Sequence, residues 1–171
     1  MKEDFYVNEL VDILKREIQS FNTVSELLIL EEKSLIDFNT RELAENLERQ
    51  EDVFSSIACL EKSRIRVLEK IGEQFGEKPE TLTIKKLASL VGNPLKKKLL
   101  ETGHVLNAIH ADIKKKKATN TMLIRQGVMI VENDIRTILN ALGVIGEKKI
   151  GYTKRAKRNP FSGGVYIDGK L

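Results

Sequence analysis

The fold is decided by residues 93–142, which read NPLKKKLLETGHVLNAIHADIKKKKATNTMLIRQGVMIVENDIRTILNAL. Asn93-Pro94 is a helix-start signal, because Asn can cap free N–H groups and Pro fits the first helical position. Gly143 comes next, and Gly favours the left-handed conformation that ends helices. The stretch predicts one helix roughly 73 Å long at 1.5 Å rise per residue. Its apolar stripe recurs at steps of three, four or seven and comprises Leu95, Leu99, Leu106, Ile109, Ile113, Asn120, Ile124, Gly127, Val131, Ile135, Ile138 and Leu142.

A helix of this length needs partner helices to cover its stripe. Apolar periodicity predicts a first helix over 4–36 and a second over about 40–75, with Asn39 and Glu42 forming a capping pair between them. The predicted buried stripe of the second helix is Leu43, Leu47, Phe54, Ile57, Leu60, Leu68, Ile71 and Phe75. Thr83 is expected to cap a short helix over 84–90 that turns the chain back.

The expected fold class is therefore all-α. We expect an elongated antiparallel bundle of three long helices, one short connecting helix and a flexible C-terminal tail. The predicted domains are a helical bundle over 1–143 and a basic, Gly-rich tail over 144–171.

Charge is distributed unevenly along the chain. Residues 1–80 carry 11 Lys/Arg and 19 Asp/Glu, whereas residues 81–171 carry 18 and 6. Either the two halves pack against each other with complementary surfaces, or the basic half meets an acidic partner or nucleic acid. The single cysteine fits a reducing compartment, and we find no signal peptide or apolar run long enough to span a membrane. The expected location is the cytoplasm.

The sequence contains no recognisable catalytic or metal-binding set. His104 and His110 are six residues apart, so they do not share a helix face as a metal-binding pair would. Cys59 lies beside Ile57 and Leu60 and is expected to be a small core residue. The sequence therefore predicts a protein that is not an enzyme, with no catalytic residues, no metal site and no cofactor.

Lys114–Lys117 form a run of four lysines within the long helix. Four consecutive residues surround a helix, so at least one lysine must lie on or near the apolar stripe. Its stem could extend past the edge of the core, or the bundle could loosen here. Nucleic-acid binding is a third interpretation, but this region lacks aromatic residues that could stack on bases, and we expect no nucleic-acid partner.

Residues 120–142 are apolar over more than one helix stripe. Two interpretations remain open: the segment lies centrally in a bundle or homodimer contact, or it offers an apolar face to a helix of another protein. The candidate residues for binding such a partner are Leu123, Ile124, Val128, Val131, Ile135, Ile138, Leu139 and Leu142.

Three short elements, in this order, resemble those of the FlgN-type flagellar export chaperones. They are the segment Thr83–Leu90, the segment Asn120–Ile124, and a tail with Tyr152 followed by a Gly-containing segment around Tyr166. The resemblance covers nearly the whole chain. It implies a cytoplasmic chaperone of hook–filament junction proteins, also called hook-associated proteins, whose terminal helical segments it keeps from assembling early.

The resemblance also implies delivery of these clients to the export gate of the flagellar type III apparatus. It assigns client binding to the C-terminal part of the long helix and the residues after it, and gate docking to a tyrosine just beyond that helix. Tyr152 lies nearest the expected place, whereas Tyr166 is the one followed by Gly after three residues. We favour Tyr152. The alternative function is a non-enzymatic coiled-coil or helical-bundle adaptor that self-associates through the same face.

Overall fold

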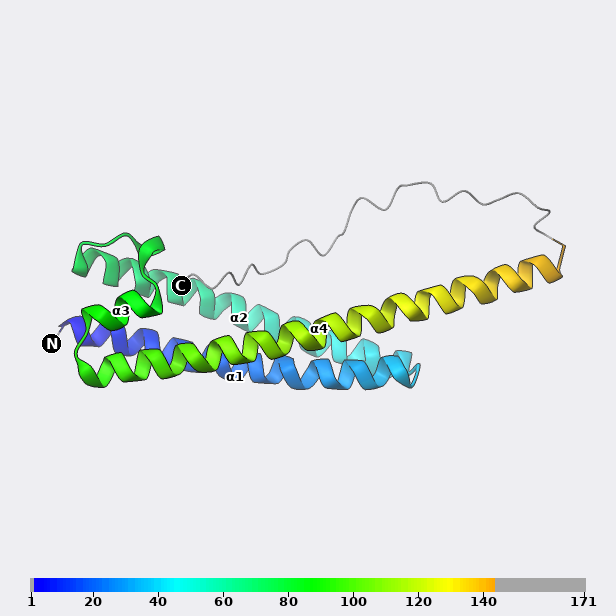
Figure 1. Cartoon of the computed structure of the whole chain (residues 1–171), viewed down its shortest axis with the longest axis horizontal. Helices are drawn as coiled ribbons and strands as arrows, with labels where there is room; N and C mark the ends of the chain where they lie inside the picture. The colour runs from blue at the N-terminus through cyan, green and yellow to red at the C-terminus, as the bar shows by residue number, and fades with distance from the viewer. Residues whose placement is uncertain (1, 144–171) are drawn as a thin grey trace. The chain divides into compact units, whose positions relative to one another are not determined.

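The computed structural model describes residues 2–143, and all the regular secondary structure in this range is helical. Three long helices and one short helix succeed each other with brief connections (Figure 1). The predicted all-α fold class is confirmed. The elements are α1 (Lys2–Ile36), α2 (Thr40–Phe75), the 3-10 helix η1 (Pro79–Thr81), α3 (Ile84–Leu90) and α4 (Asn93–Ala141).

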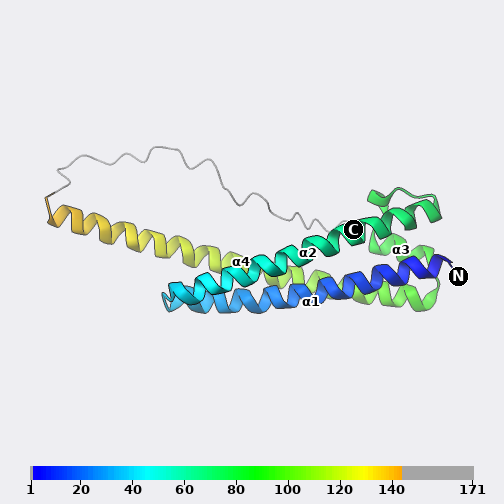
Figure 2. The ribbon, with the colours of Figure 1, turned by 180° about the vertical axis from the view of Figure 1, so that it is seen from behind.

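The described residues fall into two compact units, 2–123 and 124–143. In the first unit, α1, α2 and the beginning of α4 lie side by side in both views (Figures 1 and 2). α2 runs antiparallel to α1. α4 runs parallel to α1 (Figure 1), and its residues 110, 112 and 120 contact residues 21, 25 and 28 of α1 in the same order. This up-down-up order is what short connections between helices require.

Two of the predicted helix caps are confirmed by hydrogen bonds. The Asn39 side-chain oxygen accepts from the Glu42 N–H at 3.2 Å, and the Thr83 hydroxyl accepts from the Lys86 N–H at 3.2 Å. The third, Asn93, is instead the first residue inside α4, where the Lys96 N–H donates to the Gly92 carbonyl. Gly143 has a φ of +66°, in the left-handed region that suits a residue without a side chain. The first helix begins at Lys2 rather than at the predicted residue 4.

The core of the first unit is built from apolar side chains of α1, α2, α3 and the start of α4, together with Leu82 just before α3. α3 lies so close to α4 that a Cβ on Gly103 would sit 2.9 Å from the Ile84 Cδ1 atom. A glycine at 103 therefore permits this contact. The buried apolar cluster is Val7, Leu10, Val11, Ile13, Leu14, Phe21, Val24, Leu28, Ile57, Val67, Leu68, Ile71, Leu82, Leu87, Ala88, Leu95, Leu99 and Leu106.

The predicted stripe of α2 is wrong near the α1–α2 turn. Leu47 and Phe54 are exposed, whereas Asn46 and Gln50 are buried. The Asn46 amide donates to the Leu27 carbonyl at 3.0 Å, and the Gln50 amide donates to Asn46 and to a buried Glu31 carboxylate oxygen at 2.7 and 3.0 Å. These bonds satisfy polar groups that burial alone would destabilise. The end of the hairpin is thus held by polar contacts.

Cys59 was predicted to be a small core residue, and this prediction is also wrong. Its side chain is exposed on α2, one position before the buried Leu60. The buried face of α2 passes through Ile57 and Leu60, and Cys59 points away from it because successive helical residues are turned by about 100°.

Candidate functional site

The candidate binding residues lie on the last part of α4, after its last buried residue, Asn120. We call residues 124–142 the distal segment. The exposed fraction of its large apolar side chains is 44% at Ile124, 54% at Val131 and 69% at Leu142. An isolated helix that leaves so many large apolar side chains in water presents an interaction surface.

Most apolar residues of the distal segment share one face of the helix. At about 100° per residue, they lie within roughly 60° of Ile124 around the helix axis. Leu99, Leu106 and Ile113 fall on the same face by the same geometry. The face that is buried in the first unit therefore continues, exposed, along the distal segment. We call it the α4 stripe, and its distal members are Ile124, Val128, Val131, Ile135, Ile138, Leu139 and Leu142.

The structure separates the eight predicted binding residues into groups. Six of them are exposed on the α4 stripe, and Leu139 is half-buried on the same stripe. Leu123 is half-buried, belongs to the first unit, and lies roughly 100° off the stripe. Met129 and Ile130 are exposed outside the stripe, so the distal segment has apolar residues on other faces too. Tyr152 and Tyr166 lie outside the described residues.

A polar network joins α1 to α4 just before the distal segment. The Lys116 ammonium donates to the Ser25 hydroxyl and to an Asp112 carboxylate oxygen, each at 2.6 Å. The Ser25 hydroxyl donates to the same Asp112 oxygen at 2.6 Å. The Lys116 hydrogen bond, aided by Ser25, lowers the pKa of the Asp112 carboxyl. Lys116 is therefore the lysine of the run that reaches the edge of the core, as the sequence predicted for at least one of them.

Asn120 adds a second polar contact between the same helices. Its side-chain amide donates to the Leu28 carbonyl at 2.9 Å, and only 2% of the residue is exposed. Its Oδ1 atom is buried with no hydrogen-bond partner among the described residues. A single buried polar residue in a helix seam fixes the register of the helices more than it adds stability.

The buried Glu17 of the first unit pairs with Arg64, whereas the Nε2 atom of the half-buried His110 has no hydrogen-bond partner among the described residues. The Arg64 guanidinium donates to a Glu17 carboxylate oxygen at 3.0 Å. Burial nevertheless raises the pKa of Glu17 above its ordinary value, although Arg64 opposes the shift. Burial, and secondarily the Arg64 charge, lowers the pKa of His110, whose ring packs edge-on against Phe21 with centroids 4.7 Å apart. These three side chains are part of the packing around the core.

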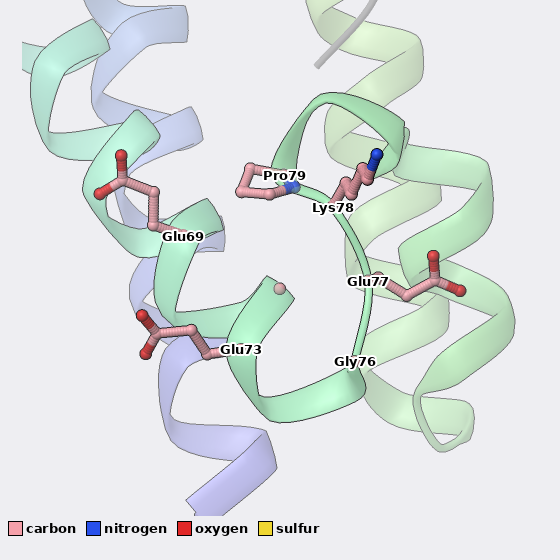
Figure 3. A pocket seen from close by; sticks show the side chains of 7 residues that line it. Glu69, Glu73, Gly76, Glu77, Lys78 and Pro79 are labelled. Atoms are coloured by element: carbon pink, nitrogen blue, oxygen red, sulfur yellow. The ribbon is translucent and has the colours of Figure 1, made fainter.

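An open pocket lies where α2 ends and the chain turns towards η1 (Figure 3). Glu69, Glu73 and Glu77 line it together with Lys78 and Pro79. The Glu73 and Glu77 side chains point in opposite directions (Figure 3), and Glu77 is paired with Lys86 at 2.6 Å. No set of three or more His, Cys, Asp or Glu side chains positioned to hold a metal ion occurs within residues 2–143.

Within the described range, no helix is both long enough and apolar enough to span a membrane. The fold defines a class: all-α proteins built as a bundle of long helices with short connections. The family model of the FlgN protein matches residues 1–160. The chain therefore belongs to the FlgN family of flagellar export chaperones, as the sequence resemblance predicted. Comparison with curated proteins and with solved structures returned no match.

Proposed function

We propose that this chain binds hook-associated flagellar proteins in the cytoplasm through the distal segment and the tail after it. It keeps their helical segments from assembling early and delivers them to the export gate. Membership of the FlgN family supports the general role in flagellar export. The residues and the client are our proposal.

One observation carries the assignment of the site: the α4 stripe is covered in the first unit and exposed along the distal segment. In the first unit the stripe packs against long amphipathic helices. A client helix with apolar residues at steps of three and four would meet the same kind of surface. The stripe is therefore suited to helical segments, and α4 offers no strand edge to which an extended peptide could add as a β-strand.

The chemistry of handover also fits this surface. In this proposal the client is held by equilibrium binding and released when the export gate competes for it. Apolar contact with a single helix face gives moderate affinity, because ordering the client helix costs free energy. Such a complex forms and dissociates without covalent chemistry.

The test is capture of purified hook-associated proteins by the full chain. We expect the triple substitution Val128→Ala, Val131→Ala and Ile135→Ala to weaken capture strongly. The matched control is Gln126→Ala, Asn133→Ala and Asn140→Ala, which alters exposed residues on the opposite side of the same helix. Equal capture by both triple variants would refute the proposed site. Truncation after Gly143 tests the tail, and unchanged affinity would remove the tail from the site.

Self-association through the same face is the competing function. It predicts a stable dimer of the client-free chain, measured by light scattering, that the Val128, Val131 and Ile135 substitutions dissociate. A monomer that still captures client would exclude it.

A further inference from the structure

α2 carries an apolar row of its own that stays exposed in the first unit. Leu47, Phe54 and Ile65 are 48%, 42% and 47% exposed. Together with three residues between them they recur at alternating steps of four and three, which is the heptad spacing of a coiled-coil seam. The six positions lie within roughly 40° of one line along the helix and extend over about 27 Å. We call this row the α2 outer seam, and its members are Leu47, Glu51, Phe54, Ala58, Glu61 and Ile65.

Two of the six seam positions are acidic. Glu51 is exposed and forms no ion pair with another residue of the range 2–143. Glu61 makes a long contact of 3.8 Å with Arg64, which is itself bonded to Glu17. The basic residue nearest the centre line of the seam is Lys62, roughly 60° away around the helix axis. A helix that packs along the seam therefore meets two carboxylates among four apolar side chains.

The positions of the two glutamates disfavour pairing of the seam with a second copy of itself. In an antiparallel pair that matches the apolar residues, Leu47 lies opposite the other copy's Ile65, and Glu51 then lies opposite the other copy's Glu61. In a parallel pair in register, each glutamate faces its own counterpart. Like charges placed against each other at an interface are unfavourable. Both orientations are therefore opposed, and the seam suits a helix of different sequence.

We propose that the α2 outer seam binds a helix of another protein with complementary chemistry. That helix carries apolar residues at heptad spacing and Lys or Arg at the two positions that face Glu51 and Glu61. Its basic head groups pair with the carboxylates, and their aliphatic stems cover the neighbouring apolar side chains. Polar residues at core positions fix partner and register at a cost in stability. The contact goes beyond the proposed client site, because it lies within the first unit and uses no residue of α4.

The composition of the seam predicts a reversible contact. A partner helix of about 20 residues spans it, but only Leu47, Phe54 and Ile65 offer large apolar side chains. The remaining specificity comes from charges at the surface, and salt screens their attraction, with a Debye length of about 10 Å at 0.1 M and about 3 Å at 1 M. Binding should accordingly weaken as the ionic strength rises.

Two synthetic helical peptides of about three heptads test the chemistry with the purified full chain. Both carry Leu at the core positions except at two, which hold Lys in one peptide and Glu in the other, and both carry a nitroxide. At low salt the Lys peptide should bind about tenfold more tightly or better, and it should broaden the amide NMR signals of residues 47–65. Glu51→Lys should remove this preference. The matched control Asp52→Lys should retain it, because residue 52 lies roughly 140° from the seam.

A photo-crosslinking residue, benzoylphenylalanine in place of Ala58, identifies the occupant in cells that express the full chain. The linked peptide, sequenced by mass spectrometry, should come from another protein and carry Lys or Arg among apolar residues at steps of three and four. Glu51→Lys should lose this link, and Asp52→Lys should keep it. The proposal is overturned if links form only within the chain or to a second copy, if no link forms, or if the linked segment lacks basic residues. It is also overturned if the two synthetic peptides bind alike or leave the signals of residues 47–65 unchanged.

Discussion

The side-chain amide of Asn120 donates to the main-chain carbonyl of Leu28 at 2.9 Å, and Asn120 is the last buried residue of α4. This bond marks the point at which the α4 stripe changes from covered to exposed. It lies at the level of the other buried polar contacts, Asn46 with Leu27 and Gln50 with Glu31. The end of the bundle nearest the distal segment is therefore held by directional bonds.

We expect Asn120→Asp to destabilise the protein by about 3 kcal/mol at neutral pH, because it buries a carboxylate facing the Leu28 carbonyl. Asn120→Leu removes both the donor and the unpartnered Oδ1 atom and should cost less than about 1 kcal/mol. Urea denaturation measures the two free energies of unfolding. Similar losses in both variants would show that the bond does not govern this position.

Two glycines of α4 make a matched pair. Gly103→Ala places a methyl group 2.9 Å from Ile84 Cδ1 and 3.1 Å from Ile84 Cγ2. We expect a net loss of about 1 kcal/mol, since overpacking costs about 1–3 kcal/mol and helix propensity returns about 1. Gly127→Ala meets nothing within 4 Å and should instead stabilise the helix by up to about 1 kcal/mol. Thermal unfolding distinguishes the signs, and destabilisation by both substitutions would contradict this account.

His110 should make stability depend on pH. Its folded pKa lies below the ordinary value of 6.5, so the unfolded chain binds a proton that the folded chain does not. The stability it contributes is present above pH 6.5 and is lost as the pH falls below that value. Comparing free energies of unfolding at pH 8 and pH 5 measures the loss, and His110→Leu should reduce it.

His104 is the control for this measurement, because it is exposed on the same helix. We expect His104→Leu to leave the difference between pH 8 and pH 5 in place. If His104→Leu removes the difference and His110→Leu does not, the half-buried His110 imidazole is not its source.

The proposed client site makes a quantitative prediction. Val128→Ala, Val131→Ala and Ile135→Ala together remove seven carbon atoms, worth up to about 0.8 kcal/mol each if buried by a client. Because buried area converts only partly into affinity, we expect a loss of about 3 kcal/mol, a more than hundredfold rise in Kd. Titration calorimetry with a hook-associated protein measures it. The free energy of unfolding should change little, since these residues are exposed.

Tyr152 is proposed to dock at the export gate. Tyr152→Ala should leave client affinity intact and reduce secretion of the client in cells. Tyr166→Ala is the matched variant, as it removes the other tyrosine of the tail. Normal secretion with Tyr152→Ala and reduced secretion with Tyr166→Ala would transfer the role to Tyr166.

Helix positions were predictable from the sequence because their signals are local. The caps at Asn39 and Thr83 and the ends of α2 and α3 depend on residues within one turn. The burial of Asn46 and Gln50 was not predictable in this way. Near the start of α2, two sets of residues have the spacing of a buried helix face: one contains Leu47 and Phe54, and the other contains Asn46 and Gln50. The set with Leu47 and Phe54 is the more apolar. The partners that bury the other row, Leu27 and Glu31, come from α1.

The candidate site was predictable in part. The excess of apolar residues after Asn120 was visible in the sequence, and the structure shows these residues exposed. Leu123 and Ile124 are adjacent in the sequence, and their different placement results from helix phase. The sequence did not indicate that Lys116 would contact Ser25, because Ser25 lies on α1, 91 residues away along the chain.

The continuity of α4 has an energetic consequence for any partner. A free peptide of about 20 residues must nucleate its helix, with a nucleation constant near 10⁻³, which corresponds to about 4 kcal/mol. In this chain the turns of α4 held by Leu99, Leu106 and Asn120 already supply that nucleus. The distal segment only has to propagate a helix that the bundle has started. A partner therefore meets a surface whose ordering cost was largely met when the bundle folded.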